Sequence, residues 1–303
     1  ILIIFSFLKQ KILTKFSLIL FLISFLSLLL VPFLGIEVKG SKRWLDLVFL
    51  PRFQPIEIVK PFFIVALSLM LTTQNRRLYF KYLLSALLIF PILLLLVYQP
   101  DIGQTFLVAM VWLALIFVSG IHIFIFFMFF IFIGSMMSYL IIFVPKFEYI
   151  KIRLLAFLDS SSGNNYQAEK ASEAIINGGF FGTGIGEGTL NSRVPEAHTD
   201  YIVSVISEEF GAIIVIGILF LYLIFSYKVI KKINILSEDL LKLILIGCIS
   251  LILLQTFIHV GVNIRILPTT GMTLPFLSYG GSSIVSTAIV SGIILNLTKR
   301  KLD

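Results

Sequence analysis

Long apolar runs dominate this chain and restrict its fold more than any other feature. Eight of them reach the length of about 20 residues that a helix needs to cross the hydrocarbon core of a bilayer. They span residues 12–34, 55–73, 79–97, 102–119, 121–144, 201–229, 240–262 and 275–297. Residues 1–8 resemble the end of another such helix, which predicts an N-terminally incomplete sequence. Because lipid offers no partners to exposed backbone, the runs predict an all-α, polytopic transmembrane protein with eight complete spans and a partial N-terminal one.

The composition excludes a soluble globular protein. Of the 303 residues, 58% are hydrophobic and 13% are charged, which leaves too little polar surface to cover a water-soluble domain. The single cysteine, Cys248, lies within an apolar run, so neither a disulfide framework nor a thiolate metal site is predicted. His122, His198 and His259 lack the close spacing of a metal motif. We therefore predict no metal site built from protein side chains.

The net charge of +8 comes largely from basic clusters between the spans. One side of the membrane carries Lys9, Lys11, Lys15, Arg76, Arg77, Lys81, Lys228, Lys231, Lys232, Lys242, Lys299, Arg300 and Lys301. The positive-inside rule makes this side cytoplasmic and accounts for the charge without nucleic acid. The loops at 35–54, 98–101, 145–200 and 263–274 then face outward. We predict one integral membrane domain over residues 1–303, with a large extracytoplasmic loop at 145–200.

The outer start of the second span carries charge at membrane depth. Its sequence is Gln54-Pro-Ile-Glu57-Ile-Val-Lys60-Pro61. One interpretation is a capped helix start with an ion pair between Glu57 and Lys60. Lys60, however, lies about one turn inside the helix, where a cation is costly and usually faces a partner or a ligand. We favour a functional role for it.

Two further outer segments give weaker signals. The turn Tyr98-Gln-Pro-Asp101-Ile-Gly-Gln-Thr105 is equally consistent with a structural helix entrance and with a functional carboxylate. The long loop carries Arg153, Tyr166, Gln167 and a glycine-rich stretch at 178–188. Such a stretch allows close backbone approach to a ligand, or it is an ordinary surface loop. It lacks the Gly-Lys-Ser/Thr ending of a nucleotide phosphate loop, and no nucleotide site is predicted.

The long loop ends in Pro195-Glu-Ala-His198-Thr-Asp200, directly before an apolar helix. Thr199 or Asp200 would serve as an ordinary helix N-cap in the simpler interpretation. Against this, Asp200, Ser204 and Ser207 or Glu208 follow helical spacing, and such a polar stripe faces protein or water rather than lipid. We therefore favour Asp200 as the reactive residue.

Residues 267–283 combine two prolines with a Gly-Gly pair at membrane depth. Irregular backbone at that depth is tolerated only where it is buried in protein or lines a cavity. The stretch, which includes Ser278 and Ser282, is expected to line a pocket.

These motifs together resemble one family over nearly the whole chain. The matching segments are Lys39-Gly-Ser-Lys-Arg43-Trp44, Gln54 to Pro61, Gln99-Pro-Asp101-Ile-Gly103-Gln-Thr105, Tyr166-Gln167, Pro195 to Asp200, Glu208-Glu-Phe-Gly211 and Leu274 to Ser283. They are similar to those of the SEDS family of cell-wall polymerases, which includes FtsW, RodA and SpoVE. Lys60 to Phe63, Gln104-Thr105 and Gly186-Glu-Gly188 lean toward the division member FtsW rather than the elongation member RodA.

The resemblance implies a fold of ten transmembrane helices and a multi-pass protein of the bacterial cytoplasmic (inner) membrane with an extracytoplasmic catalytic face. It implies a peptidoglycan glycosyltransferase that polymerises lipid II, an undecaprenyl-diphosphate-linked disaccharide-pentapeptide, during septal wall synthesis in cell division. It also implies a class B penicillin-binding protein and other divisome proteins as partners, besides the lipid bilayer. The family's essential aspartate falls on Asp200.

The residues suit this chemistry. Asp200 would act as general base on the acceptor hydroxyl. The leaving diphosphate needs cations, for which the candidates are Arg43, Lys60, Arg153, Arg193 and Arg265. A divalent cation, Mg²⁺ or Mn²⁺, would share this task. The further substrate-binding candidates are Glu57, Tyr166, Gln167, His198, Ser278 and Ser282.

The chain departs from the family pattern at two positions. Many FtsW proteins carry a lysine where this chain has Thr270, so the positive charge near Asp200 must come from Lys60 or an arginine. The second departure is Ile56, which replaces a common serine. Three rival functions stay open. A lipid II flippase or transporter would suit the irregular segment and the buried Lys60. The same residues are compatible with a non-catalytic scaffold and with an elongation-type RodA polymerase.

Overall fold

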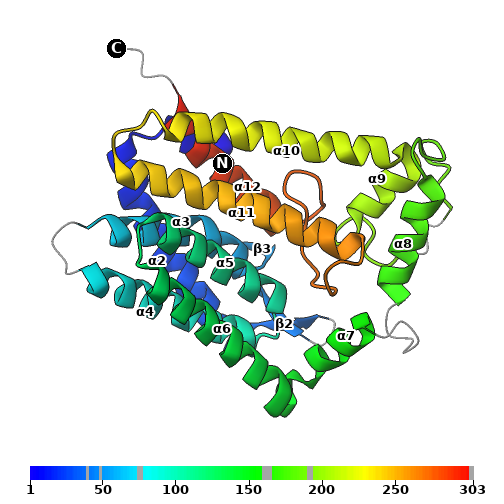
Figure 1. Ribbon diagram of the computed structural model, residues 1–303, viewed down its shortest axis with the longest axis horizontal. Helices are drawn as coiled ribbons and strands as arrows, with labels where there is room; N and C mark the ends of the chain where they lie inside the picture. The colour runs from blue at the N-terminus through cyan, green and yellow to red at the C-terminus, as the bar shows by residue number, and fades with distance from the viewer. Residues whose placement is uncertain (39–40, 48–49, 74–77, 159–165, 190–193, 300–303) are drawn as a thin grey trace. The chain divides into compact units, whose positions relative to one another are not determined.

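The computed structural model describes residues 1–303 except 39–40, 48–49, 74–77, 159–165, 190–193 and 300–303 (Figure 1). Within this part, seven helices are long and apolar enough to cross a membrane, and α5 (Ile102–Val118) is a shorter apolar helix. These eight helices correspond to the eight predicted spans. The seven are α2 (Gln10–Leu34), α3 (Pro55–Thr72), α4 (Leu78–Tyr98), α6 (Ile123–Phe143), α10 (Ala212–Ile233), α11 (Asp239–Asn263) and α12 (Gly281–Thr298).

The chain forms two compact units. The first comprises Ile1–Phe126, Ser226–Leu254 and Gly280–Asp303, and the second comprises Phe127–Phe225 and Gln255–Tyr279. Both α10 and α11 contribute residues to each unit. The predicted single domain stays a prediction.

Helix α3 is the core of the first unit. It contacts α2, α4, α5 and α12, and most of its side chains are buried. The α11 residue Gly247 also packs on it: a Cβ at Gly247 would lie 2.5 Å from Cγ2 of Ile64. This close approach favours glycine, because a methyl group would have to displace side-chain atoms of Ile64 and Leu115. Buried apolar surface on all sides of α3 explains why charge on this helix must be paired inside protein.

The outer segment at 36–53 forms a small sheet that the sequence pattern did not predict. Strands β1 (Ile36–Val38), β2 (Ser41–Leu47) and β3 (Leu50–Phe53) are antiparallel in the order β1-β2-β3. Ile36 pairs with Trp44, and Leu45 pairs with Phe53. Leu45 is fully buried and anchors the sheet, so that β2 presents Arg43 from a rigid element.

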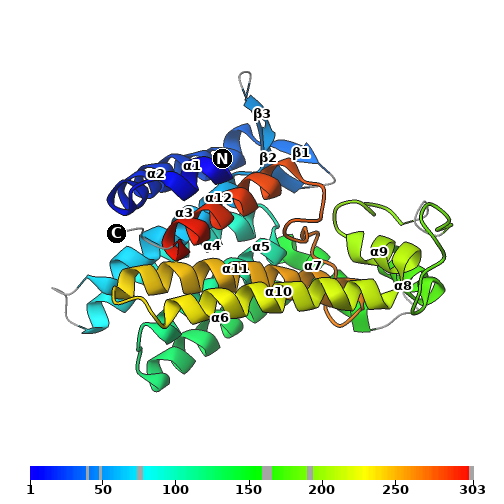
Figure 2. The same ribbon diagram turned by 90° about the horizontal axis from the view of Figure 1, so that it is seen from above.

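The short helix α1 (Leu2–Phe7) packs along α12 (Figure 2). A Cβ at Gly292 would lie 2.7 Å from the carbonyl oxygen of Leu2, so the two backbones are in direct contact. Nδ2 of the buried Asn296 donates to the carbonyls of Phe5 at 2.8 Å and Leu8 at 2.6 Å. A single amide thus satisfies carbonyl groups that a helix end leaves without intrahelical partners.

The predicted span at 201–229 is wrong in its continuity. The structure divides it into α9 (Ile202–Phe210) and α10, with Gly211 between them at φ +84°. A Cβ at Gly211 would lie 2.1 Å from the carbonyl oxygen of Phe180, which also favours glycine. The helix therefore breaks where the chain must turn past the long loop.

The long loop itself contains helices. These are the 3₁₀ turn η1 (Pro145–Phe147), α7 (Glu148–Leu158) and α8 (Tyr166–Gly178). Ala168, Ala171, Ala174 and Gly178 form the buried face of α8, and this helix packs on α9. Small side chains on that face bring the two helices close together.

The predicted irregular backbone between α11 and α12 is confirmed. Residues 264–280 contain no regular helix, and α12 begins at Gly281 rather than at the predicted residue 275. Arg265, Gly271 and Phe276 all have positive φ angles in this segment. The pocket that it was expected to line stays a prediction.

Candidate active site

Asp200 ends a tight turn in the second unit. The backbone N–H groups of Thr199 and Asp200 both donate to the carbonyl of Glu196, at 3.1 and 3.0 Å. Glu196 itself has a φ of +61°. The turn therefore ends immediately before α9 with a defined backbone direction.

The interpretation of Thr199 or Asp200 as a helix cap is wrong. The N-cap of α9 is Tyr201, and no side chain makes a capping hydrogen bond there. The hydroxyl of Thr199 donates to Glu196 instead. Asp200 is partly exposed, whereas Ser204, Ser207 and Glu208 are buried in protein, as the polar stripe predicted. The carboxylate of Asp200 is thus not used to start the helix.

Asn263, at the end of α11, holds the backbone of Asp200. Its Nδ2 donates to the carbonyl of Asp200 at 3.0 Å and to that of His259 at 2.8 Å. Its Oδ1 accepts the N–H of Ser204 at 3.2 Å. The side chain is completely buried. One amide therefore joins α11 to both sides of the α9 entrance.

The segment after α11 makes a second attachment. The Ser278 hydroxyl donates to the carbonyl of Thr199 at 2.6 Å and accepts the N–H of Leu274 at 2.8 Å. The N–H of Tyr279 donates to the carbonyl of His198 at 2.9 Å. These bonds hold the turn before Asp200 independently of Asn263.

Gly271 lies beside the carboxylate. A Cβ at this position would be 3.4 Å from Oδ2 of Asp200, and the φ of Gly271 is +68°. Glycine is favoured at such a φ because other L-residues are strained there. The irregular segment thus brings bare backbone next to the reactive candidate.

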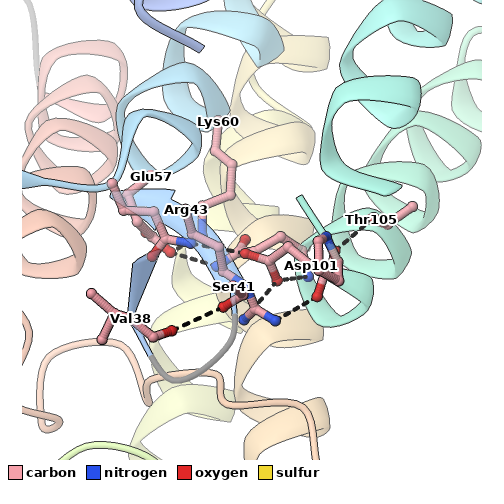
Figure 3. Close-up of polar contacts among 10 residues, drawn as sticks. Val38, Ser41, Arg43, Glu57, Lys60, Asp101 and Thr105 are labelled. Carbon is pink, nitrogen blue, oxygen red and sulfur yellow. Dashed lines mark hydrogen bonds and ion pairs between the residues drawn. The ribbon is translucent and has the colours of Figure 1, made fainter. Parts of the chain in front are cut away.

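A separate polar cluster lies in the first unit, around Lys60 (Figure 3). Lys60 is 1% exposed, and its Nζ lies 2.8 Å from Oε1 of Glu57. The same oxygen accepts Nε2 of Gln104 at 2.6 Å. Oε2 of Glu57 and Oε1 of Gln104 are buried without a hydrogen-bond partner among the described residues. The predicted ion pair exists, and its two charges compensate each other inside the protein.

Asp101 forms the second half of this cluster. Its Oδ1 lies 3.6 Å from Nη1 of Arg43, and its Oδ2 accepts Nε2 of Gln54 at 2.9 Å. Asp101 also caps α5 by accepting the N–H of Gln104 at 3.4 Å. Burial raises the pKa of the Asp101 carboxyl, and the charge of Arg43 opposes this rise. Arg43 further donates to the carbonyl of Pro100, which ties β2 to the α4–α5 turn.

The remaining predicted site residues are placed as follows. Ser282 is buried in the first unit, and its hydroxyl accepts the N–H of Gln54 at 2.9 Å. Tyr166 and Gln167 lie exposed at the start of α8, and the side chain of His198 is exposed. Arg265, at φ +58°, is partly exposed two residues after Asn263. Arg193 and the side chain of Arg153 lie outside the described residues. The substrate-binding roles stay predictions.

Several polar residues at these two sites were missed or given too little weight. Asn263 and Gln104 sit in otherwise apolar helices, and this rarity was the available signal. The sequence favours neither a structural nor a functional role for Asp101, although this residue is 2% exposed and bonded to Gln54 and Arg43. Its partners lie far away in sequence, so spacing alone could not reveal them.

Comparison with known proteins agrees with these motifs. Residues 1–302 match the family described as cell cycle protein, which comprises FtsW, RodA and SpoVE. The chain belongs to this family. The resemblance to the SEDS polymerases is therefore confirmed, together with the polytopic helical fold.

Similar proteins come from several bacteria. A probable peptidoglycan glycosyltransferase FtsW of Coxiella burnetii is 36% identical over 299 residues, which cover 95% of this chain and 79% of that protein. A protein of the same description from Caulobacter vibrioides is 32% identical over 277 residues, covering 89% and 68%.

Solved structures share the fold. A structure from work on the coordination of polymerization and crosslinking by a peptidoglycan synthase complex aligns with a TM-score of 0.79 at 27% identity, covering 98% of this chain and 84% of that chain. The rod shape determining protein RodA of Thermus thermophilus aligns with a TM-score of 0.72 at 26% identity, covering 100% and 84%.

Proposed function

We propose that this multi-pass membrane protein polymerises lipid II into glycan strands of the septal wall, with Asp200 as general base. The enzyme class rests on relatives named peptidoglycan glycosyltransferase that are 32–36% identical over most of this chain. Their shared name FtsW supports a role in cell division. Two parts of the proposal go further than these names: that lipid II is the donor and that the strands belong to the septal wall.

The observation that carries the base assignment is the way Asp200 is held. Its backbone is bonded to Glu196 and Asn263, and the preceding carbonyl is bonded to Ser278. Asp200 is nevertheless partly exposed, and its Oδ2 lies beside Gly271. A base must reach the proton that it takes while keeping its direction, and this arrangement provides both.

The reaction transfers a sugar from a lipid diphosphate. Asp200 takes the proton of the acceptor hydroxyl as that oxygen forms a bond to the anomeric carbon of the donor. The bond between this carbon and the diphosphate breaks, and the electron pair leaves with the lipid diphosphate. No nucleotide is consumed, because the activated bond arrives with the donor.

Two of the cationic candidates for binding the diphosphate are already paired with carboxylates. Lys60 and Arg43 are held against Glu57 and Asp101, so a phosphate would compete with a carboxylate for each of them. Arg265 belongs to the same unit as Asp200 and follows the helix end that holds it. We propose Arg265 as a diphosphate ligand because it lies in the same unit as Asp200, and Lys60 and Arg43 stay candidates from the sequence.

A divalent cation would have to be bound mainly by the substrate. Among the described residues, no group of three His, Cys, Asp or Glu side chains is placed to hold a metal ion. Mg²⁺ commonly binds through one or two carboxylates together with substrate phosphates. We propose that Mg²⁺ or Mn²⁺ enters with the diphosphate.

Charge and the solved relatives support the proposed location and partners. The basic clusters assign one side as cytoplasmic, so we propose the inner membrane with catalysis on the extracytoplasmic side. The structural relative from a peptidoglycan synthase complex supports a class B penicillin-binding protein as partner. Other divisome proteins are proposed on the FtsW likeness alone.

The test is polymerisation of lipid II by the purified protein reconstituted with its partner. Asp200→Asn should abolish long glycan strands while the protein still inserts and keeps its thermal stability. Glu187→Gln is the matched control, because it removes an exposed outer-loop carboxylate. Strands of unchanged length and rate from Asp200→Asn would reject the base assignment.

The same vesicles discriminate against a flippase. A fluorescent lipid II accessible from one leaflet reports translocation, and gel electrophoresis reports polymer. An enzyme gives polymer that depends on Asp200. A transporter gives translocation that depends on Asp200 and never gives polymer.

A further inference from the structure

The glycine-rich loop after α8 exposes large apolar side chains. Phe180 is 71% exposed, Phe181 is 85% exposed and Ile185 is 80% exposed. Between residues 178 and 188 the only charged side chain is that of Glu187. An apolar cluster of this kind on an outer loop marks an interaction surface.

This loop is attached directly to the start of a membrane helix. The N–H groups of Ala212 and Ile213, the first residues of α10, donate to the carbonyls of Gly179 at 2.9 Å and Phe180 at 3.4 Å. The absence of a side chain at Gly211 permits this approach. The level of Phe180 relative to the first turn of α10 is therefore set by backbone hydrogen bonds.

Helix α10 carries its own apolar surface from that turn onward. Ile213, Ile216 and Phe220 are 48%, 62% and 61% exposed. Its basic residues, Lys228, Lys231 and Lys232, lie toward the other end. A helix with this pattern crosses the bilayer with its first turn at the outer interface.

We infer that Phe180, Phe181 and Ile185 form an anchor that inserts into the outer leaflet of the bilayer beside α10. The loop exposes apolar side chains and is bonded to the first turn of a helix whose exposed side chains are also apolar. Aromatic and aliphatic side chains at such an interface gain from leaving water, and residues 178–188 carry no basic group that would favour a phosphate headgroup instead. The occupant is therefore the acyl and glycerol region of lipid.

The anchor has a consequence for Asp200 that rests on the proposed function. Thr183 and Gly184 donate their N–H groups to the carbonyls of Glu208 and Glu209, at 2.8 and 3.1 Å, near the end of α9. The nine residues of α9 span about 13 Å at 1.5 Å per residue. Since Asp200 lies at the other end of this helix, the anchor sets the depth of the carboxylate relative to a lipid-linked diphosphate.

Insertion of the loop is tested with nitroxide labels, which report the depth of a side chain in a reconstituted bilayer. Cys248 is replaced by alanine, and a single cysteine is introduced by Phe181→Cys or Ile185→Cys. Phe220→Cys is the lipid-facing reference. Glu173→Cys, on an exposed charged residue of α8, is the aqueous control. Power saturation compares access of oxygen, which is enriched in lipid, with access of a water-soluble nickel chelate.

The labels at 181 and 185 should resemble the one at 220, with high oxygen access and low nickel access. Nickel access equal to that at 173 would overturn the anchor. Labels that are water-accessible in the protein alone and shielded only after the partner is added would also overturn it, because the occupant would then be protein. No step of this measurement needs catalysis, so its failure is separate from failure of the proposed function.

A second variant tests the depth-setting role. Phe180→Ser with Phe181→Ser should slow polymerisation several-fold, whereas the pair of Phe→Leu changes should retain it. Both pairs keep the backbone bonds to α10. Equal rates from the serine and leucine pairs would overturn the link between anchor and Asp200.

Discussion

Acidic side chains are held differently in the two compact units. In the first, Glu57 and Asp101 are almost fully buried, and each lies against a cation. In the second, Asp200 is partly exposed, and hydrogen bonds to its backbone hold it in place. Carboxylates of the first kind mainly organise the protein, because their charge is already neutralised. A residue of the second kind has its backbone fixed by hydrogen bonds and stays partly exposed, as the proposed base requires.

Asp200→Asn and Asp101→Asn should show the largest contrast, because the first lowers the polymerisation rate and the second lowers the stability. General bases contribute about 10²- to 10⁴-fold to rate, so Asp200→Asn should lose that much polymerisation with little change in stability. Asp101→Asn leaves the Arg43 charge without its carboxylate and should lower the free energy of unfolding by about 1–3 kcal/mol. Lipid II turnover and thermal unfolding in detergent measure both. Equal losses of stability would remove the distinction between the two sites.

Lys60→Met tests whether the buried pair does more than stabilise. Removing one partner of a buried pair typically costs about 3–5 kcal/mol, because the other charge is left uncompensated. The double variant Glu57→Gln, Lys60→Met removes both charges and should recover most of the stability.

Activity of the double variant decides the role of Lys60. If Lys60 takes part in the reaction, polymerisation stays low although stability is recovered. Full recovery of polymerisation together with stability would make the pair purely structural.

Gly271→Ala should harm catalysis more than stability. A non-glycine residue at φ +68° costs about 1–2 kcal/mol, and the added methyl group would touch the carboxylate of Asp200. Gly186→Ala is the control, since its φ is +76° and nothing lies within 4 Å of the new Cβ. We expect the two variants to have similar thermal stabilities, and only Gly271→Ala to have a lower polymerisation rate. Matching activities would show that the carboxylate tolerates this contact.

Ser278→Ala should have the smallest effect on the rate of polymerisation. It removes two hydrogen bonds that hold the turn before Asp200, at a net cost of about 1 kcal/mol each. A positioning role predicts a lower kcat with little change in KM for lipid II. A higher KM with an unchanged kcat would instead support the predicted role of Ser278 in substrate binding.

The sequence identified residues of the candidate site, but it did not predict which residues contact them. Asp200 and Lys60 were recognisable because charge beside or within apolar helices is rare and costly. Asn263, which holds the backbone of Asp200, lies 63 positions away, and Gln104 donates to Glu57, the partner of Lys60, from 47 positions away, so no local pattern connects them. The break at Gly211 was missed because residues 201–229 are apolar enough throughout to suggest one helix.

The sequence by itself determined that this chain is a helical membrane protein of the FtsW, RodA and SpoVE family, because hydrophobic run length and motif order are local properties. The tertiary structure decided which charges are neutralised, how the turn before Asp200 is held and where the loop at 178–184 meets α10. These depend on contacts between residues distant in the chain. Such contacts arise from packing and from hydrogen bonds to backbone groups, which residue identity alone does not encode.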